Sequence, residues 1–275
     1  MVRLDRTFKP SKNSDTLSTT GIASLIFTKV ETMAREFTIF KGLANEKVVE
    51  TKVRLELGPT EAVIKQTHSG VCSTDVHILD RGSALGHEGV GIVEALGPYT
   101  YLISDIKVGD KVGYGWNQKY CGKCRPCRAG YDSICANVKE LWAPDNETGS
   151  FGTGGIWDVS GLHKIPDELE SKHAAPLMCA GATVWGAMQR GKIMSHHRVG
   201  VVGVGGLGHL AIQFLAKSGC EVVVISSSDR KKGEAFELGA TEFRVVKDVE
   251  KFKEKPFQPL DYLMICTGAQ PDYDL

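Results

Sequence analysis

Six of the eight cysteines fall into two groups whose residue types and spacing suit metal binding. The first group lies within one short segment with the pattern C-x2-C-x2-C-x7-C, made by Cys121, Cys124, Cys127 and Cys135. Four thiolates around one ion form the closed tetrahedral site that structural zinc prefers. The first three cysteines are too close together for a disulfide framework, and in a reducing compartment such spacing usually indicates metal. The segment therefore predicts a structural zinc site.

The second group is scattered along the chain and consists of Cys72, His87 and Cys179, each inside a local motif of its own. Three protein ligands leave one coordination position open for water or substrate, as in catalytic zinc sites. A lone cysteine is usually a small apolar core residue, and a lone histidine is more often a hydrogen-bonded structural residue. The three together, each in its motif, favour a second zinc site of the catalytic kind.

A glycine-rich motif with the pattern G-x-G-x-x-G follows the second group, at Gly203-Val-Gly205-Gly206-Leu207-Gly208. Alone it is weak evidence. Here an apolar run, Val199 to Gly203, precedes it and an apolar helical pattern, Leu207 to Lys217, follows it. In a dinucleotide site these glycines let backbone amides approach the pyrophosphate at the start of the helix.

These motifs resemble the zinc-containing medium-chain alcohol dehydrogenases, and within them the branch of the cinnamyl alcohol dehydrogenases. The resemblance runs from about Glu36 to the end of the chain. It implies that Cys72, His87 and Cys179 bind the catalytic zinc, with Glu88 as an occasional fourth ligand or a purely structural residue. It implies two zinc ions per chain, and small alcohol or aldehyde substrates.

The same resemblance assigns supporting roles around the catalytic zinc. Asp75 would hold His87 by a hydrogen bond that fixes its tautomer. Thr74 and His77 would carry the proton from the alcohol towards solvent. Trp116 and Trp142 are candidate walls of the substrate pocket, although a core or surface role fits them as well. In the family the four-cysteine segment is structural.

The residues after the second strand of the nucleotide region bear on the choice of cofactor. An enzyme specific for NAD places Asp or Glu there, about twenty residues after the glycine motif, to bind the ribose 2′-hydroxyl. This chain has Ser226, Ser227 and Ser228, followed by the cations Arg230, Lys231 and Lys232. Serines beside cations can accommodate a 2′-phosphate, so the sequence favours NADP(H) over NAD(H). The alternative is that these cations are the solvated first turn of a helix, and Asp229 argues against a phosphate.

The elements that must position these motifs divide into two kinds. From Glu36 to about Ala180, short apolar runs broken by glycine predict a β-rich domain with many turns, which the resemblance identifies as GroES-like. After Cys179, strands at 199–203, 221–226, 243–246 and 260–266 alternate with helices at 207–217 and 230–238. This alternation predicts a doubly wound parallel sheet of the Rossmann type. The expected domains are 1–32, an N-terminal extension that is disordered or spurious; 33–181, the catalytic domain; and 182–275, a partial nucleotide domain.

The composition excludes several function classes. The 33 basic and 33 acidic side chains balance to a formal net charge of zero, which argues against a general nucleic-acid or membrane-surface binder. A zinc ribbon that binds nucleic acid would have only a modest patch to use, made of Lys119, Lys123, Arg125 and Arg128. No apolar stretch is long enough, and free enough of polar residues, to span a bilayer. We expect a cytoplasmic protein that binds neither nucleic acid nor membrane.

The chain has fewer strands than the resemblance implies. The family's nucleotide domain has six parallel strands, and only about four are evident here, so we expect a C-terminally truncated relative with an exposed apolar edge strand. The family forms homodimers through the missing part, which makes dimerisation of this chain doubtful. Two alternatives to an active alcohol dehydrogenase follow: a non-catalytic zinc protein, and a polyol dehydrogenase of the same family.

Overall fold

The computed structural model describes residues 33–43, 47–140, 146–246 and 258–268. The chain divides into two units, residues 1–33 and 34–275, and the helices and strands of the described residues all lie in the second. The predicted extension at 1–32 and the candidate pocket residue Trp142 lie outside the described residues. No helix among the described residues has the length and apolar character needed to cross a membrane.

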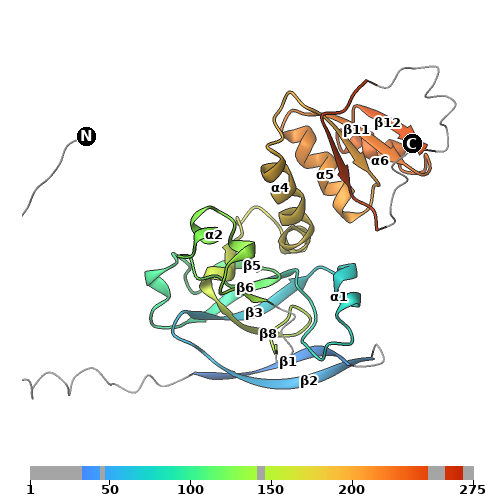
Figure 1. The fold of residues 1–275 in the computed structure, drawn as a ribbon. Helices are drawn as coiled ribbons and strands as arrows, with labels where there is room; N and C mark the ends of the chain where they lie inside the picture. Colours follow the sequence, from blue (N-terminus) through green and yellow to red (C-terminus); the bar gives the residue numbers. More distant parts are fainter. Residues whose placement is uncertain (1–32, 44–46, 141–145, 247–257, 269–275) are drawn as a thin grey trace, which may run out of the picture. The chain divides into compact units, whose positions relative to one another are not determined.

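The first part of the unit is built from antiparallel strands (Figure 1). Its main sheet has the strand order β8-β3-β4-β5-β9. The bounds of these strands are β3 Glu61–Ser69, β4 Gly89–Leu96, β5 Lys111–Tyr114, β8 Gly154–Asp158 and β9 Leu162–Lys164. A long hairpin, β1 (Ala34–Leu43) and β2 (Lys47–Glu56), pairs with itself over its full length. This architecture confirms the predicted GroES-like β-rich domain.

The core of this part follows from the apolar runs noted in the sequence. Ala62 and Ile64 of β3 are completely buried, and so are Val112 and Tyr114 of β5. The ring of Tyr114 packs on Trp157 of β8 with 4.1 Å between centroids. Burial of such aromatic pairs contributes more than their area alone would give, by roughly 0.5–1.5 kcal/mol. The well-packed sheet therefore anchors the loops that leave the ends of its strands.

Short helices and two small strands lie in those loops. They are α1 (Ser73–His77), η1 (Thr100–Leu102), β6 (Asn117–Lys119), α2 (Arg125–Arg128), η2 (Asp132–Ile134), β7 (Lys139–Glu140), η3 (Val159–Gly161), α3 (Ser171–Ala174) and η4 (Ala175–Met178). A longer helix, α4 (Ala180–Gly191), follows directly after η4. All the candidate metal ligands lie in or beside these loops rather than within the sheet strands.

The last part of the chain is a parallel sheet with the order β12-β11-β10-β13. Its elements are β10 (Arg198–Val202), α5 (Gly206–Lys217), β11 (Glu221–Ser226), α6 (Lys232–Glu237), β12 (Glu242–Val245) and β13 (Tyr262–Ile265). Helix α5 packs on β10, on β11 and against α4. Each predicted strand and helix is present with its ends displaced by a few residues, and the predicted doubly wound sheet is confirmed.

The apolar core of this sheet lies under α5. Val199 and Val201 of β10, together with Val222 and Val224 of β11, contribute alternate side chains to it. Cys220 is buried there, whereas Cys266 is only half-buried against the same core. Strand β13 forms one edge of the described sheet, and the side chains of its residues Leu263 and Ile265 are exposed.

Candidate metal centres and nucleotide site

The structure brings the scattered ligands Cys72, His87 and Cys179 together with Glu88. One ligand atom from each of the four lies within 4.8 Å of all the others. Cys72 caps the start of α1, His87 and Glu88 directly precede β4, and Cys179 lies between η4 and α4. His87 and Glu88 are buried. Four soft or anionic donors at this spacing suit a zinc ion, so the residues present fit the metal that the sequence predicts.

Asp75 organises this cluster. Its Oδ2 accepts a hydrogen bond from the backbone N–H of Cys72 at 3.0 Å, and its Oδ1 accepts one from the backbone N–H of Gly86 at 3.2 Å. The ring Nδ1 of His87 lies 2.8 Å from Oδ1. An Nδ1–H donated to Asp75 leaves Nε2, which is 3.3 Å from the Cys179 sulfur, to serve as a ligand.

The electrostatics of the cluster reflect this close packing. Burial alone would lower the pKa of His87, but the contacts with Asp75 and Cys179 outweigh burial and raise that pKa to about 10. Burial also raises the pKa of Glu88. Burial acts in the same direction on Cys72, yet contacts with Thr74 and His87 lower the pKa of this thiol overall. A divalent cation would meet a compact, partly anionic donor set here.

Glycine makes room for the carboxylate of Glu88. A Cβ atom at Gly70 would lie 1.9 Å from Oε2 of Glu88, closer than any real contact. Ser150 supports the other side of the same loop, where its Oγ accepts a hydrogen bond from the backbone N–H of Glu88 at 3.3 Å and lies 2.8 Å from Oγ of Ser69. Ser150 could not be predicted from the sequence as a partner of Glu88, because no local motif links two residues that are more than sixty positions apart.

The remaining predicted residues of this region lie close to the cluster. Oγ1 of Thr74 is 3.5 Å from the sulfur of Cys72. His77, at the end of α1, is exposed. The indole of Trp116 meets the His87 ring edge to face, with 5.5 Å between centroids. No side-chain hydrogen bond joins Thr74 and His77 among the described residues, so the proton relay stays a prediction.

The four-cysteine segment forms the second cluster, with its four sulfurs within 4.8 Å of one another. Backbone N–H groups point at these sulfurs: the N–H of Cys124 lies 3.4 Å from the Cys121 sulfur, and those of Cys121 and Asn137 lie 3.4 and 3.3 Å from the Cys135 sulfur. Such hydrogen bonds favour the thiolate form, and those from the backbone of residues 123 and 124 lower the pKa of Cys121 to about 6.

The turns that wrap the segment require glycine at two positions. Gly122 and Gly130 have positive φ angles of 66° and 78°. A Cβ atom at either position would meet nothing within 4 Å, so the backbone conformation and not crowding explains the glycine. Pro126 lies in the first turn of α2 between the second and third cysteines. The residues present fit a structural zinc ion as predicted.

The glycine motif lies between β10 and α5, where the sequence analysis expects it. Gly203 has a positive φ of 89°, and a Cβ atom at Gly208 would lie 2.0 Å from the carbonyl oxygen of Gly203. A Cβ atom at Gly205 or Gly206 would meet nothing within 4 Å. Protein packing therefore explains Gly208 but not Gly205 and Gly206, and the open space beside the last two fits a ligand that approaches the backbone.

The other predicted cofactor residues lie at the same end of the sheet. Leu207 is in the first turn of α5 and is partly exposed. Ser226 ends β11, and Ser227 and Ser228 follow it in an exposed bend. Nζ of Lys231 donates a hydrogen bond of 2.7 Å to the carbonyl oxygen of Val204 inside the glycine loop.

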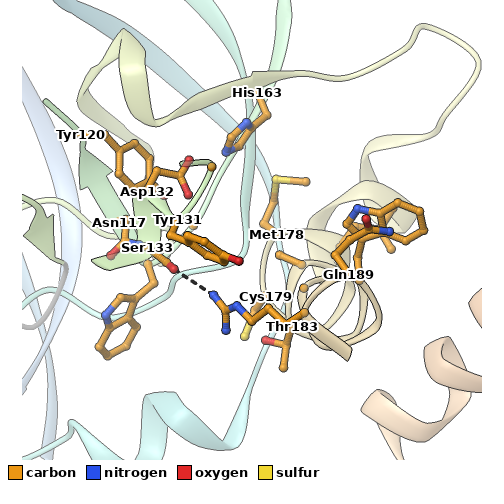
Figure 2. Close-up of a pocket in the computed structure, with 18 of the residues that line it drawn as sticks. Asn117, Tyr120, Tyr131, Asp132, Ser133, His163, Met178, Cys179, Thr183 and Gln189 are labelled. Carbon is orange, nitrogen blue, oxygen red and sulfur yellow. Dashed lines mark hydrogen bonds between the residues drawn. The ribbon is translucent and has the colours of Figure 1, made fainter. Parts of the chain in front are cut away.

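A cavity of about 890 Å³ borders the Cys72–His87 cluster. It is lined by Cys179, by Trp116, by residues of the four-cysteine region and by one face of α4. Figure 2 shows Tyr131, His163, Met178 and Cys179 around this space, with the guanidinium of Arg190 donating a hydrogen bond to Ser133 Oγ at 3.1 Å. The predicted ligand Cys179 thus faces a space large enough for a small organic molecule.

Comparison with known proteins agrees with this fold and with the candidate metal centres. Residues 58–167 match the family model of the alcohol dehydrogenase GroES-like domain, and residues 199–274 match the model described as ketopantoate reductase PanE/ApbA. Over 226 residues the chain is 37% identical to the aldehyde reductase AdhA of Synechocystis, a match that covers 80% of this chain. The chain belongs to the zinc-containing medium-chain alcohol dehydrogenase family. Its relatives in that family include a cinnamyl alcohol dehydrogenase of Ocimum basilicum, 34% identical over 223 residues and 75% of this chain.

A solved structure of this alcohol dehydrogenase family supports the fold. A cinnamyl alcohol dehydrogenase of Sorghum bicolor superposes with a TM-score of 0.75 at 29% identity, over 86% of this chain and 71% of that one. The present chain spans only 66% of the length of the Synechocystis relative and 61% of the Ocimum relative.

Proposed function

We propose that this chain is a zinc-dependent oxidoreductase that transfers hydride between NADP(H) and a primary alcohol or its aldehyde, with an aromatic or medium-chain substrate. One observation carries the proposal: the ligand atoms of Cys72, His87, Glu88 and Cys179 converge within 4.8 Å beside a cavity that Cys179 also lines. The printed names of the two relatives, an aldehyde reductase and a cinnamyl alcohol dehydrogenase, agree with this substrate class.

In this proposal Cys72, His87 and Cys179 hold the catalytic zinc, and Glu88 lies ready as a further donor. Zinc bound there supplies a Lewis acid that stabilises negative charge on the substrate oxygen. Asp75 keeps His87 in the ligating tautomer by its 2.8 Å contact with Nδ1. The four cysteines of the second cluster hold a structural zinc, which gives two ions per chain.

The chain's own residues supply the route for the proton. Thr74, half-buried beside the Cys72 sulfur, is close enough to the metal cluster to accept a proton from the substrate hydroxyl while it donates its own proton towards His77. His77, exposed at the end of the same helix, can pass a proton to water. The order from half-buried hydroxyl to exposed imidazole supports the proposed relay.

The cofactor proposal rests on the glycine loop and on the end of β11. The space beside Gly205 and Gly206 suits a pyrophosphate, and NADP(H) bound there supplies the hydride. No carboxylate occurs at Ser226, Ser227 or Ser228, where an NAD-specific enzyme would place one, although Asp229 follows them. The cations Arg230, Lys231 and Lys232 come after Asp229, which supports a preference for the 2′-phosphorylated cofactor.

The lining of the cavity supports an aromatic or long apolar substrate. Trp116 and Trp185 contribute indole rings to its wall, Tyr131 contributes a phenol and Met178 an adaptable thioether. The indole of Trp116 also packs on His87, so a ring that stacks on it would lie near the proposed metal. This arrangement supports Trp116 as a pocket wall, as predicted from the sequence.

The test is oxidation of NADPH by this chain with cinnamaldehyde, with NADH run in parallel. We expect turnover that prefers NADPH and that a zinc chelator abolishes. Cys179→Ala should abolish turnover and remove one zinc ion while the four-cysteine cluster keeps its own. Met178→Leu, an apolar change at the adjacent lining residue, is the matched control and should retain both zinc ions.

Other outcomes favour the alternatives. A folded protein with two zinc ions and no turnover on either cofactor would favour a non-catalytic zinc protein. Turnover of a polyol such as sorbitol, without turnover of cinnamaldehyde, would favour a polyol dehydrogenase. Full activity in Cys179→Ala would remove that residue from the catalytic site.

A further inference from the structure

A turn that follows β4 exposes a run of apolar side chains. This apolar turn spans residues 98–104 and contains η1. Tyr101, Leu102 and Ile103 are 72%, 65% and 54% exposed, and half of Tyr99 is exposed as well. Within the part of the chain that the structure describes, no other three consecutive large apolar side chains are exposed. Single exposed apolar residues are ordinary on a protein surface, whereas a contiguous group marks an interaction site.

The fold anchors the apolar turn at both ends. The backbone N–H of Tyr99 donates a hydrogen bond of 2.8 Å to the carbonyl oxygen of Pro59, in the loop before β3. Thr100 is buried, and its Oγ1 donates a hydrogen bond of 3.0 Å to the carbonyl oxygen of Gly97. Ile106, which follows the turn, is buried in the core of the main antiparallel sheet. The apolar side chains between these anchors therefore cannot turn inward without breaking contacts.

The exposure of these side chains costs free energy that a single copy of the chain does not recover. Burial of one large apolar side chain stabilises a protein by roughly 1.5–3 kcal/mol relative to exposure to water. Tyrosine is also enriched at interfaces, because its ring is apolar and its hydroxyl group can find a hydrogen-bond partner. With two tyrosines, a leucine and an isoleucine exposed, the apolar turn has the composition of an interface core.

We infer that the apolar turn is a self-association surface, through which two copies of this chain pack about a two-fold axis. The inference goes beyond the proposed function, since residues 98–104 include neither a candidate metal ligand nor a lining residue of the cavity. In a two-fold contact the same surface is used by both copies, so it must complement itself in shape and charge.

The charges beside the apolar turn favour a second copy as its partner. Asp105 directly follows the turn and is exposed. Its carboxylate is 4.0 Å from Nζ of Lys164, which is closer to Asp110 at 3.0 Å, so Asp105 is loosely held. Lys107, of opposite sign, is exposed two residues further on. Across a two-fold axis, Asp105 of each copy can therefore face Lys107 of the other. Such exposed pairs select the partner more than they stabilise the dimer.

A lipid bilayer suits the apolar turn less well than a second copy does. Anionic headgroups attract protein segments that carry several basic residues. Asp105 and Lys107 cancel each other, so the charges that flank the turn give it no net attraction to such a surface. The same neutral pair is what a self-complementary contact requires.

Sedimentation velocity of the full chain tests the inference over concentrations from about 1 to 100 µM, because small interfaces associate weakly. We expect an equilibrium between monomer and dimer. Leu102→Asp should raise the dimer dissociation constant about tenfold or more, because it places a charge in the apolar centre of the contact. Val48→Asp, the same change at an exposed apolar residue of β2, is the matched control and should leave the constant within about twofold.

An exchange of charges tests the two-fold arrangement. Lys107→Asp brings like charges together across the axis and should raise the dissociation constant about threefold or more. Asp105→Lys combined with Lys107→Asp restores opposite charges and should recover the wild-type constant. Circular dichroism identifies any variant that fails to fold, and Tyr101→Ser then provides a second variant of the apolar centre, for which we expect the same loss of dimer.

Three results would overturn the inference. The first is a wild-type chain that stays monomeric at the highest concentration. The second is a dimer that Leu102→Asp leaves unchanged, which would favour the exposed edge at β13. The third is a monomer that binds vesicles of phosphatidylcholine and phosphatidylserine and loses this binding in Leu102→Asp, which would identify a membrane-binding turn. Turnover of cinnamaldehyde is measured separately, so a failure here is distinguishable from a failure of the proposed function.

Discussion

Asp75 is the residue on which two of the candidate zinc ligands depend. It accepts a hydrogen bond from the backbone of Cys72 and faces the ring of His87, and it is almost fully buried. Its two oxygens thereby fix both the start of α1 and the orientation of the imidazole. A buried carboxylate with these contacts acts on the metal only through its neighbours, so its effect should appear as metal affinity.

Asp75→Asn should weaken zinc binding at the Cys72–His87–Cys179 cluster by about 10- to 100-fold, because the amide cannot supply two anionic acceptors. The four-cysteine cluster should keep its zinc. Competition against a graded chelator, read as zinc released per chain, measures both sites in one titration. Asp80→Asn, a nearby exposed carboxylate, is the control, and equal zinc release from Asp75→Asn and this control would contradict the role.

At the scale of elements, the loop that joins β10 to α5 contains glycines of two kinds. Gly208 is required by packing, because a Cβ atom there would strike the Gly203 carbonyl oxygen at 2.0 Å. Gly205 faces open space and has an extended backbone, with φ −92° and ψ −162°, that other residues also adopt. One motif thus combines a glycine that packing requires with a glycine that packing does not explain.

Alanine substitutions should separate these two requirements. Gly208→Ala should destabilise the fold by about 1–3 kcal/mol, because the helix must move away from the strand. Gly205→Ala should leave the thermal midpoint unchanged and weaken the binding of NADPH and NADH alike. Thermal unfolding and dinucleotide titration together provide the measurement. Equal loss of stability in the two variants would show that Gly205 is also a packing residue.

The four-cysteine segment has little core of its own, since only Cys135 among its cysteines is buried. A metal ion bound by the four thiolates would therefore supply much of its stability. Cys124→Ser should remove about one zinc ion per chain and lower the thermal midpoint, whereas Lys123→Ala, an exposed change in the same turn, should do neither. Elemental analysis and calorimetry measure the two effects, and a soluble Cys124→Ser of unchanged stability would contradict a structural site.

The sequence predicts individual strands, helices and motifs better than it predicts which of them lie side by side in the fold. Both cysteine groups and the glycine loop could be found because their residues sit in short motifs, and the parallel strands because each is a short apolar run. The place of β8 next to β3, or of Ser150 under Glu88, could not be found in this way. Such pairings depend on long-range packing, which leaves no periodic pattern in the sequence.

At the scale of the whole molecule, Asp158 joins three distant segments of the chain. At the end of β8, it accepts hydrogen bonds from Thr60 at 2.7 Å and Ser160 at 2.7 Å, and it pairs with Lys119 at 2.9 Å. Burial alone would raise the pKa of Asp158, but these partners outweigh burial and lower it. The folded protein therefore favours the ionised carboxylate.

This pKa shift predicts how stability depends on pH. A carboxylate whose pKa is lowered in the folded state stabilises the protein above its unfolded value of about 3.9, and this contribution is lost as the pH falls through the folded value. Asp158→Asn should therefore be less stable than wild type at neutral pH, by about 1–3 kcal/mol.

The difference in unfolding free energy between wild type and Asp158→Asn should shrink as the pH falls below about 4. Denaturant titrations at several pH values measure it. Asp105→Asn, whose carboxylate is 88% exposed, should match wild type throughout. A difference that stays constant down to pH about 3 would show that shape and not charge accounts for the effect.

The two metal clusters differ in how much of the chain each must assemble. The four cysteines lie between residues 121 and 135, so one small loop closure completes their site. The other cluster draws on residues from 72 to 179 and is complete only when the antiparallel sheet and the start of α4 are in place. Closing a short loop costs less entropy and takes less time than forming long-range contacts. During synthesis the four-cysteine cluster can therefore form early, whereas the Cys72–His87 cluster is complete only when all the parts of the chain that contribute to it have folded.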